Sequence, residues 1–402
     1  MGVSPADDSD APQMLRIGMV CPYSLTIPGG VQAQVLGLAR SLRAKGHEVR
    51  VLGPCDGPPP DPFVTPLGNS LPTAANGSIA PLAPDVSAAL RTARALNDEA
   101  FDVIHVHEPF APGPSLTAVM LKLAPTVATF HSAGYTSSYR MWGKSMKIIA
   151  PRIDIRTAVS KDAVELAQQY LGGDYEVLFN GIEVDRYRPS STNTAETKRE
   201  NAIFFIGRHE PRKGLAVLLE AMKKLPADVT LWIGSDGPET DALKEQYKGD
   251  ARIEWIGRIS DEEKIERLHR SGVFCAPSLH GESFGVVLLE AMASRTPVVA
   301  SSLDGYRNVA THDVNALLVE PGDVDALASA LARVLVDTRL RQRLVDAGST
   351  HAESYSMDAL ADRYVEIYHR LLHMDIDNIA KFAMPRPLRK LNKRLLRRSK
   401  VD

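Results

Sequence analysis

The feature that most constrains the fold is an alternation of strand-like and helix-like segments that runs twice along the chain. In the first half, apolar runs of strand length recur, at 15–21, 48–54, 101–107, 125–131 and 153–160. Helical patterns separate several of them, as at 31–46, where Val31, Val35, Leu38 and Leu42 recur at three- and four-residue spacing. Strands alternating with helices are typical of βαβ units with a parallel sheet.

The alternation weakens at the polar stretch 185–201 and then restarts. Further strand-like runs follow, at 202–207, 229–234, 251–257, 273–278 and 297–302. The sequence therefore predicts an α/β protein with two Rossmann-like, doubly wound parallel-sheet domains that face each other across a crevice. In such folds, ligands bind at the carboxyl ends of the strands, beside helix N-termini.

The predicted boundaries follow from this pattern. Residues 15–190 form an N-terminal, acceptor-side domain, and residues 200–353 form a C-terminal donor domain. A helix at 354–373 is expected to pack back toward the N-terminal domain. The polar, acidic residues 1–14 are expected to be a disordered extension.

Composition excludes several classes of protein. The 402 residues include 47 Lys or Arg and 49 Asp or Glu, so the formal net charge is −2. This balance argues against a disordered chain and against a wholly basic nucleic-acid binder. Cys21, Cys55 and Cys275 cannot build a disulfide framework, which favours a reducing cytoplasm. We identify no signal peptide and no apolar run of about 18 residues, the length that a transmembrane helix needs.

The near-neutral total conceals a basic C-terminal tail. Residues 374–402 hold nine Lys or Arg against three Asp, so this segment carries +6 and the remainder −8. Between 381 and 400, leucines are interspersed among the cations. A basic amphipathic segment favours an anionic membrane surface. The alternative is a solvated tail, or one attracted to nucleic acid.

In each predicted domain, a glycine-containing turn follows the first strand. Residues 28–32 (PGGVQ) let a ligand approach the backbone, and the helix start supplies N–H groups that suit a phosphate. By itself this pattern is weak evidence for a ligand site, because a plain tight turn has the same residues. Residues 207–214 (GRHEPRKG) combine Arg208 and Lys213, which suit a pyrophosphate. The alternative there is a solvated charge cluster.

A third motif, at 280–290 (HGESFGVVLLE), carries two glutamates eight residues apart. On one helix, Glu282 and Glu290 would share a face about 12 Å apart. Glu290 lies inside an apolar run, where burial is costly unless the carboxylate has a partner such as a ligand hydroxyl.

Histidines mark the ends of two strands in the first domain. His131 is placed to hydrogen-bond a sugar or to transfer a proton. His105, His107 and Glu108 have a spacing that suggests a metal site, but no further ligand accompanies them, and we reject one. In the second domain, the turn before 261 is a helix N-cap signature and a candidate nucleobase site.

Taken together, these motifs resemble the retaining family-4 glycosyltransferases, which have the GT-B fold. The matching segments run in order over about residues 15–370: PGGVQ, HVHEP, TFHS, AVSK, NGIEVDRY, GRHEPRKG, IGSDGPE, GESFGVVLLEAMA and TPVVAS. Within that family, the similarity is greatest to the mycobacterial phosphatidylinositol mannosyltransferases. The resemblance implies sugar transfer from GDP-mannose, with retention of configuration, to phosphatidylinositol or a related inositol lipid.

The resemblance also implies roles for individual residues. Arg208 and Lys213 would hold the donor diphosphate, Glu282 the transferred sugar and Glu290 the ribose, with His131 beside the sugar and acceptor. The other donor-binding residues would be Gly30, Ile259, Asp261, Lys264, Ser283, Phe284 and Gly285. The acceptor-binding residues would be Tyr23, Gln32, Asn76 and Ser78. We expect no metal and no tightly bound cofactor, and we do not expect nucleic acid as a partner.

Two rival functions remain open at this point. One keeps the fold and uses a UDP-sugar, with a soluble inositol phosphate or a polysaccharide as acceptor. The other is a GT-B-like epimerase or a non-catalytic nucleotide-sugar binder. The expected location is the cytoplasm, with peripheral attachment to the inner face of the cell membrane through the tail.

Overall fold

The structure is a computed structural model, and it describes residues 14–75, 78–132, 146–189, 199–282 and 284–374. The contacts divide the chain into two compact units. The first unit contains the described residues of 14–158, 164–177 and 361–374. The second unit contains those of 159–163 and 178–360.

The first unit is built on a seven-stranded parallel sheet in the order β3-β2-β1-β6-β7-β8-β9. Its strands are β1 (Arg16–Val20), β2 (Glu48–Gly53), β3 (Val64–Pro66), β6 (Val103–His107), β7 (Thr126–Phe130), β8 (Ile155–Ala158) and β9 (Glu176–Val177). The helices of this part of the chain are α1 (Gly30–Ala44), α2 (Val86–Asp98), α3 (Pro114–Leu121) and α5 (Lys161–Leu171). A separate antiparallel hairpin, β4 (Leu71–Ala75) and β5 (Ser78–Leu82), was not predicted from the sequence.

The second unit is built on a six-stranded parallel sheet in the order β12-β11-β10-β13-β14-β15. Its strands are β10 (Ala202–Ile206), β11 (Thr230–Gly234), β12 (Ile253–Gly257), β13 (Val273–Ala276), β14 (Val298–Ser301) and β15 (Leu317–Val319). Its helices are α6 (Val184–Tyr187), α7 (Leu215–Met222), α8 (Thr240–Gln246), α9 (Asp261–Arg270), α10 (Val286–Ala293), α11 (Asp304–Arg307), α12 (Val324–Val336) and α13 (Thr338–Glu353).

Alternation along the strands of this second sheet fills a core on each of its faces. On β10, Ile203 and Phe205 pack into one hydrophobic cluster, with residues of α7 and α12. Phe204 lies between them on the strand and points to the opposite face, where it packs with Trp232 and Phe274 in a second cluster. A strand buried on both faces explains why AIFFI reads as a continuous apolar run.

Both sheets contain the switch in strand order that creates a binding edge in doubly wound folds. In the second sheet, β10 lies between β11 and β13. The strands β11 and β12 are added on one side of β10, and β13, β14 and β15 are then added on the other side. In the first sheet, β1 lies between β2 and β6 in the same way. Ligands of such sheets bind at the carboxyl ends of the strands at this switch point. The predicted fold class and the predicted strands of both sheets are confirmed.

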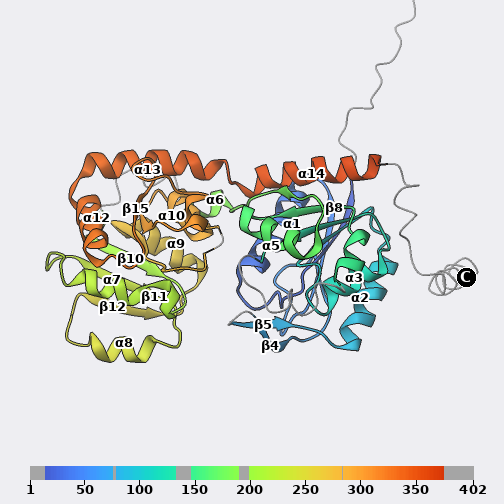
Figure 1. The fold of residues 1–402 in the computed structure, drawn as a ribbon, viewed down its shortest axis with the longest axis horizontal. Helices are drawn as coiled ribbons and strands as arrows, with labels where there is room; N and C mark the ends of the chain where they lie inside the picture. The colour runs from blue at the N-terminus through green and yellow to red at the C-terminus, as the bar shows by residue number, and fades with distance from the viewer. Residues whose placement is uncertain (1–13, 76–77, 133–145, 190–198, 283, 375–402) are drawn as a thin grey trace, which may run out of the picture. The chain divides into compact units, whose positions relative to one another are not determined.

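The last described helix, α14 (Met357–His373), belongs to the first unit from residue 361 onward. The Tyr364 hydroxyl lies 2.9 Å from the Thr129 Oγ1 of β7, and Lys45 pairs with Asp362 at 2.6 Å. Figure 1 shows this helix alongside α1 and β8. Within the described residues, no helix combines the length and apolar character that crossing a membrane would require.

Candidate functional site

A cationic turn follows β10 at the switch point of the second sheet. Pro211–Lys213 form one turn of 3₁₀ helix, and Gly214 then takes a left-handed conformation (φ +68°) before α7. A Cβ atom on Gly214 would lie 1.9 Å from the carbonyl oxygen of Pro277, which follows β13. Only glycine permits this approach, so the turn after β10 is held directly against the turn after β13.

This approach brings Glu282 onto the cations. Its Oε1 lies 2.6 Å from Lys213 Nζ and 3.5 Å from Arg212 Nη1. The same oxygen accepts a hydrogen bond of 2.9 Å from the Ser278 hydroxyl, which also lies 3.0 Å from the Tyr306 hydroxyl. The Glu282 side chain is only 12% exposed. Its partners therefore hold a charged carboxylate at the sheet edge, because charge-assisted hydrogen bonds offset its desolvation.

The prediction that Glu282 and Glu290 share one face of a helix was wrong. Helix α10 begins at Val286, because Gly285 takes a left-handed conformation (φ +93°) at its N-cap. Glu282 therefore lies in the preceding turn. Phe284 is 1% exposed and stacks on Phe179, with ring centroids 5.3 Å apart, so its side chain belongs to the core. Ser283 lies outside the described residues.

Glu290 has protein partners that the sequence analysis did not identify. Its Oε1 accepts a 2.7 Å hydrogen bond from the Tyr187 hydroxyl of α6 and lies 3.2 Å from Lys264 Nζ. Burial alone lowers the pKa of Lys264, but the negative charge of Glu290, with Tyr187 and Asp261, outweighs it and raises that pKa. Burial and then the charge of Glu290 raise the pKa of the Tyr187 phenol. Tyr187 and Lys264 thus hold the Glu290 side chain at the edge of the sheet.

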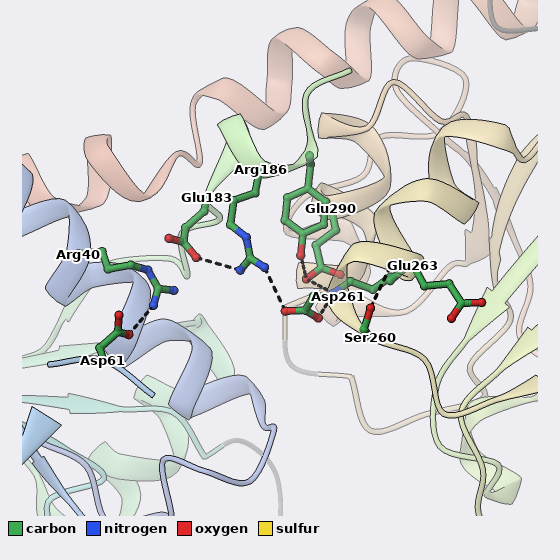
Figure 2. Close-up of polar contacts among 10 residues, drawn as sticks. Arg40, Asp61, Glu183, Arg186, Ser260, Asp261, Glu263 and Glu290 are labelled. Atoms are coloured by element: carbon green, nitrogen blue, oxygen red, sulfur yellow. Dashed lines mark hydrogen bonds and ion pairs between the residues drawn. The ribbon is translucent and has the colours of Figure 1, made fainter. Parts of the chain in front are cut away.

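A second ion-pair chain lies beside this one. Figure 2 shows the Arg186 guanidinium between the carboxylates of Glu183 and Asp261, at 3.4 Å from each. The predicted N-cap is confirmed, since the Ser260 hydroxyl accepts from the Glu263 backbone N–H at 3.2 Å. Ile259, just before it, packs partly buried at the edge of the core. Lys264, Asp261 and Glu290 therefore come together. Tyr187 and Arg186 join them from the start of the polar stretch 185–201, to which the sequence analysis assigned no functional residue.

Arg208 differs from its predicted partner Lys213. Its side chain is exposed, and no ion pair involving it is present among the described residues. Arg212 instead supplies the second cation on Glu282, and it also pairs with Glu210 at 2.7 Å. The sequence signal for Arg212 was its place beside Lys213 in the same strand-to-helix turn.

The glycine turn of the first unit leads into α1. Gly29 is the extended N-cap, and a Cβ atom on Gly30 would meet no atom within 4 Å. No described atom therefore crowds the α-carbon of Gly30, and its contact with a donor phosphate stays a prediction. Gln32 is buried, and its Nε2 donates to the carbonyl oxygens of Ser24 (3.3 Å) and Ile27 (3.1 Å). Its amide donor thus closes the loop that follows β1.

The predicted acceptor residues are only partly described. Tyr23 forms a bridge to Leu82 of β5, and burial, with the charge of Glu108, raises the pKa of its phenol. Asn76 lies outside the described residues, as does the side chain of Ser78. Their predicted contact with an acceptor stays a prediction.

His131, after β7, has well-defined partners in the first unit. Its Nε2 lies 3.0 Å from His107 Nδ1, and its backbone N–H donates to Glu108 Oε1 at 2.9 Å. Burial lowers the pKa of His131 to about 3, and it raises the pKa of Glu108. The ring of His131 is therefore neutral around pH 7, which suits hydrogen bonding to an uncharged or anionic ligand.

Two family models together match most of the chain. The family model described as "Glycosyltransferase Family 4" matches residues 28–186, and the model "Glycosyl transferases group 1" matches residues 189–351. The phosphatidyl-myo-inositol mannosyltransferase of Mycobacterium leprae is 38% identical over 88% of this chain and 96% of its own length. That of Mycolicibacterium smegmatis is 38% identical over 88% and 93%. A sucrose-phosphate synthase structure from Thermosynechococcus elongatus superposes with a TM-score of 0.71 at 19% identity, covering 90% of this chain and all of that one.

Proposed function

The chain belongs to the family-4 glycosyltransferases of GT-B fold, and on that basis we propose that it transfers mannose from GDP-mannose to phosphatidylinositol or a related inositol lipid, with retention of configuration. The observation that carries the proposal is the contact of Lys213 with Glu282 at the switch point of the second sheet. The choice of sugar and acceptor is supported by relatives 37–38% identical that are named phosphatidyl-myo-inositol mannosyltransferases.

In this proposal, Arg208 and Lys213 stabilise the diphosphate leaving group. Negative charge develops on the leaving oxygen when the sugar–phosphate bond breaks, and cations already placed there lower the barrier. Lys213 is held in place by Glu282, so little reorganisation is needed during the reaction. Arg208 is exposed and is the cation we expect to swing onto the phosphates. No metal is needed in this scheme.

The remaining donor contacts are proposed from the family resemblance. Glu282 accepts hydrogen bonds from hydroxyls of the transferred sugar, and the backbone around Ser283, Phe284 and Gly285 donates to its oxygens. Glu290, held by Tyr187 and Lys264, accepts from the ribose hydroxyls. The base lies by Ile259, Asp261 and Lys264. In the first unit, Gly30 contacts the phosphate and His131 the sugar.

The donor is tested by thermal unfolding with GDP-mannose, UDP-glucose and UDP-N-acetylglucosamine. A ligand at 100 times its dissociation constant stabilises the native state by about 2.7 kcal/mol, so we expect a rise in Tm with GDP-mannose alone. Glu290→Gln should reduce that rise, because the amide is a poorer acceptor for the ribose hydroxyls. Stabilisation by a UDP-sugar and not by GDP-mannose would favour the rival function instead. Mannose transfer to phosphatidylinositol is then assayed directly.

For the acceptor, we propose contacts from Tyr23, Asn76 and Ser78. Gln32 is assigned to the same side, where it shapes the loop between Ser24 and Ile27. An inositol lipid is presented at a membrane surface, so the enzyme would act as a peripheral protein on the inner face of the cell membrane.

We further propose that the basic segment 381–400 binds this surface. Each Lys or Arg near an anionic membrane contributes about 1 kcal/mol, so nine cations are sufficient for reversible attachment. The chain shortened after residue 373 should lose most of its co-sedimentation with vesicles of phosphatidylcholine and anionic phosphatidylinositol. Unchanged sedimentation of the shortened chain would reject this assignment. Vesicles of phosphatidylcholine alone provide the control, since they lack the charge.

A further inference from the structure

Three histidines stack on one face of the first unit's sheet. His105 and His107 are two residues apart on β6, so both side chains point to the same face. His131, two residues beyond Thr129 of β7, continues that face on the neighbouring strand. The ring centroids of His105 and His107 are 4.3 Å apart, and those of His107 and His131 are 5.2 Å apart, with both pairs of planes at 29°. His107 is thus enclosed between the other two imidazoles.

The inner end of the stack is fully hydrogen-bonded. His105 Nδ1 lies 2.7 Å from the Tyr368 hydroxyl, and His105 Nε2 lies 2.7 Å from Thr129 Oγ1. Thr129 in turn contacts the Tyr364 hydroxyl at 2.9 Å. Tyr364 and Tyr368 are four residues apart on α14, so they lie on the same face of this helix. Through them, α14 holds the His105 end of the stack. His105 therefore has a fixed ring plane against which His107 packs.

At the outer end, one hydrogen bond joins His107 to His131, and one nitrogen of each ring is left over. His107 Nδ1 lies 3.0 Å from His131 Nε2. His107 is 2% exposed, and its Nε2 is buried without a hydrogen-bond partner among the described residues. The Nδ1 of His131 likewise makes no hydrogen bond within the described part of the chain, and this side chain is only half-buried. Among the described residues, His131 Nδ1 is therefore the exposed-side ring atom without a partner.

The position of the protons follows from this pattern. Both rings are neutral, because burial lowers the pKa of each. One proton lies between His107 Nδ1 and His131 Nε2. A buried N–H without an acceptor is rarer in proteins than a buried acceptor without a donor. His107 therefore carries its proton on Nδ1 and donates it to His131 Nε2, which leaves His131 protonated on Nδ1.

We propose that His107 is a positioning residue that fixes the tautomer and ring plane of His131, so that His131 presents Nδ1–H as a hydrogen-bond donor to an oxygen of the substrate. This deepens the role proposed above for His131 and rests on it. A donor is what an alcohol or phosphate oxygen with growing negative charge needs in the transition state. The opposite tautomer would present a lone pair, which repels such an oxygen.

The tautomer is measured by long-range proton–nitrogen NMR of the full chain labelled with ¹⁵N-histidine. The His131 signals are identified by their loss in His131→Ala. We expect a protonated Nδ1 and an unprotonated Nε2 for His131 in the wild-type protein. In His107→Leu, which removes the donor but keeps the volume, we expect a mixture of both tautomers. A wild-type His131 with unprotonated Nδ1 would overturn the proposal whatever the kinetics.

Two variants test the consequence for catalysis. Partners that orient a functional ligand typically contribute 10–100-fold, so His107→Leu should lower kcat by about that factor and leave KM for the donor nearly unchanged. His107→Asn places an amide donor at the same distance along the side chain as Nδ1, and it should recover most of the kcat and the His131 tautomer. Equal loss in both variants would indicate a merely structural role and reject the proposal.

A double variant separates this inference from the function on which it rests. In a His131→Ala background, His107→Leu should cause no further loss of kcat, because the group that it positions is gone. If His131→Ala itself retains wild-type kcat, the role proposed for His131 is wrong, and the tautomer measurement still decides whether His107 orients the ring. A full additional loss in the double variant would contradict the positioning role.

Discussion

Alanine at Lys213 lowers the rate of sugar transfer by about 10²–10³-fold, the usual loss when one preorganised electrostatic contact to a transition state is removed. Lys213 Nζ lies 2.6 Å from Glu282 and its side chain is 21% exposed, so it sits at the sheet edge without a structural role in the core. The expected change is in kcat, measured with GDP-mannose and phosphatidylinositol. The thermal unfolding temperature should stay close to that of the wild type.

Lys223 provides the matched control. It is a lysine of the same unit, paired with Glu220 at 2.7 Å, but its side chain is 56% exposed on the protein surface. An exposed ion pair contributes less than about 1 kcal/mol, so Lys223→Ala should leave both kcat and unfolding temperature unchanged. Glu282→Gln complements the test, because it removes the charge that holds Lys213 while keeping the shape. Wild-type turnover in Lys213→Ala would exclude the diphosphate role.

Alanine at Gly214 destabilises the second unit by about 3 kcal/mol or more, the cost typical of strain at a special backbone position combined with overpacking. Gly214 has φ +68°, and the new Cβ would lie 1.9 Å from the Pro277 carbonyl oxygen. The turn after β10 must then move away from the turn after β13, which carries Lys213 away from Glu282. For a unit of this size the loss corresponds to a fall in unfolding temperature of about 6–12 °C.

Gly249→Ala is the control for this substitution. Gly249 is exposed in a turn after α8, its φ is not in the left-handed region, and a Cβ there meets no atom within 4 Å. It should change the unfolding temperature by no more than about 1–2 °C. If Gly214→Ala unfolds at the wild-type temperature, the close approach of the two turns does not constrain this edge.

The sequence predicted the elements that local pattern determines. The strand at 202–206 was evident from its length and its continuous apolar residues, because a strand buried on both faces needs no alternation. The cap at Ser260 was evident because its hydroxyl bonds a backbone N–H three residues away. The turns bearing Gly30 and Lys213 were found for the same reason, since a strand-to-helix turn is a local feature. Family resemblance then supplied roles for those positions.

Contacts between distant residues were decided only by the tertiary structure. Tyr187 reaches Glu290 across 103 residues, and Tyr368 reaches His105 across 263. Glu282 was placed on a helix by spacing alone, whereas that helix begins only at Val286, after the left-handed N-cap Gly285. The physical reason is that periodicity shows which side chains share a face of one element but not which element packs against that face. The residues and their chemistry were thus determined by the sequence, and their partners, charges and proton positions by the fold.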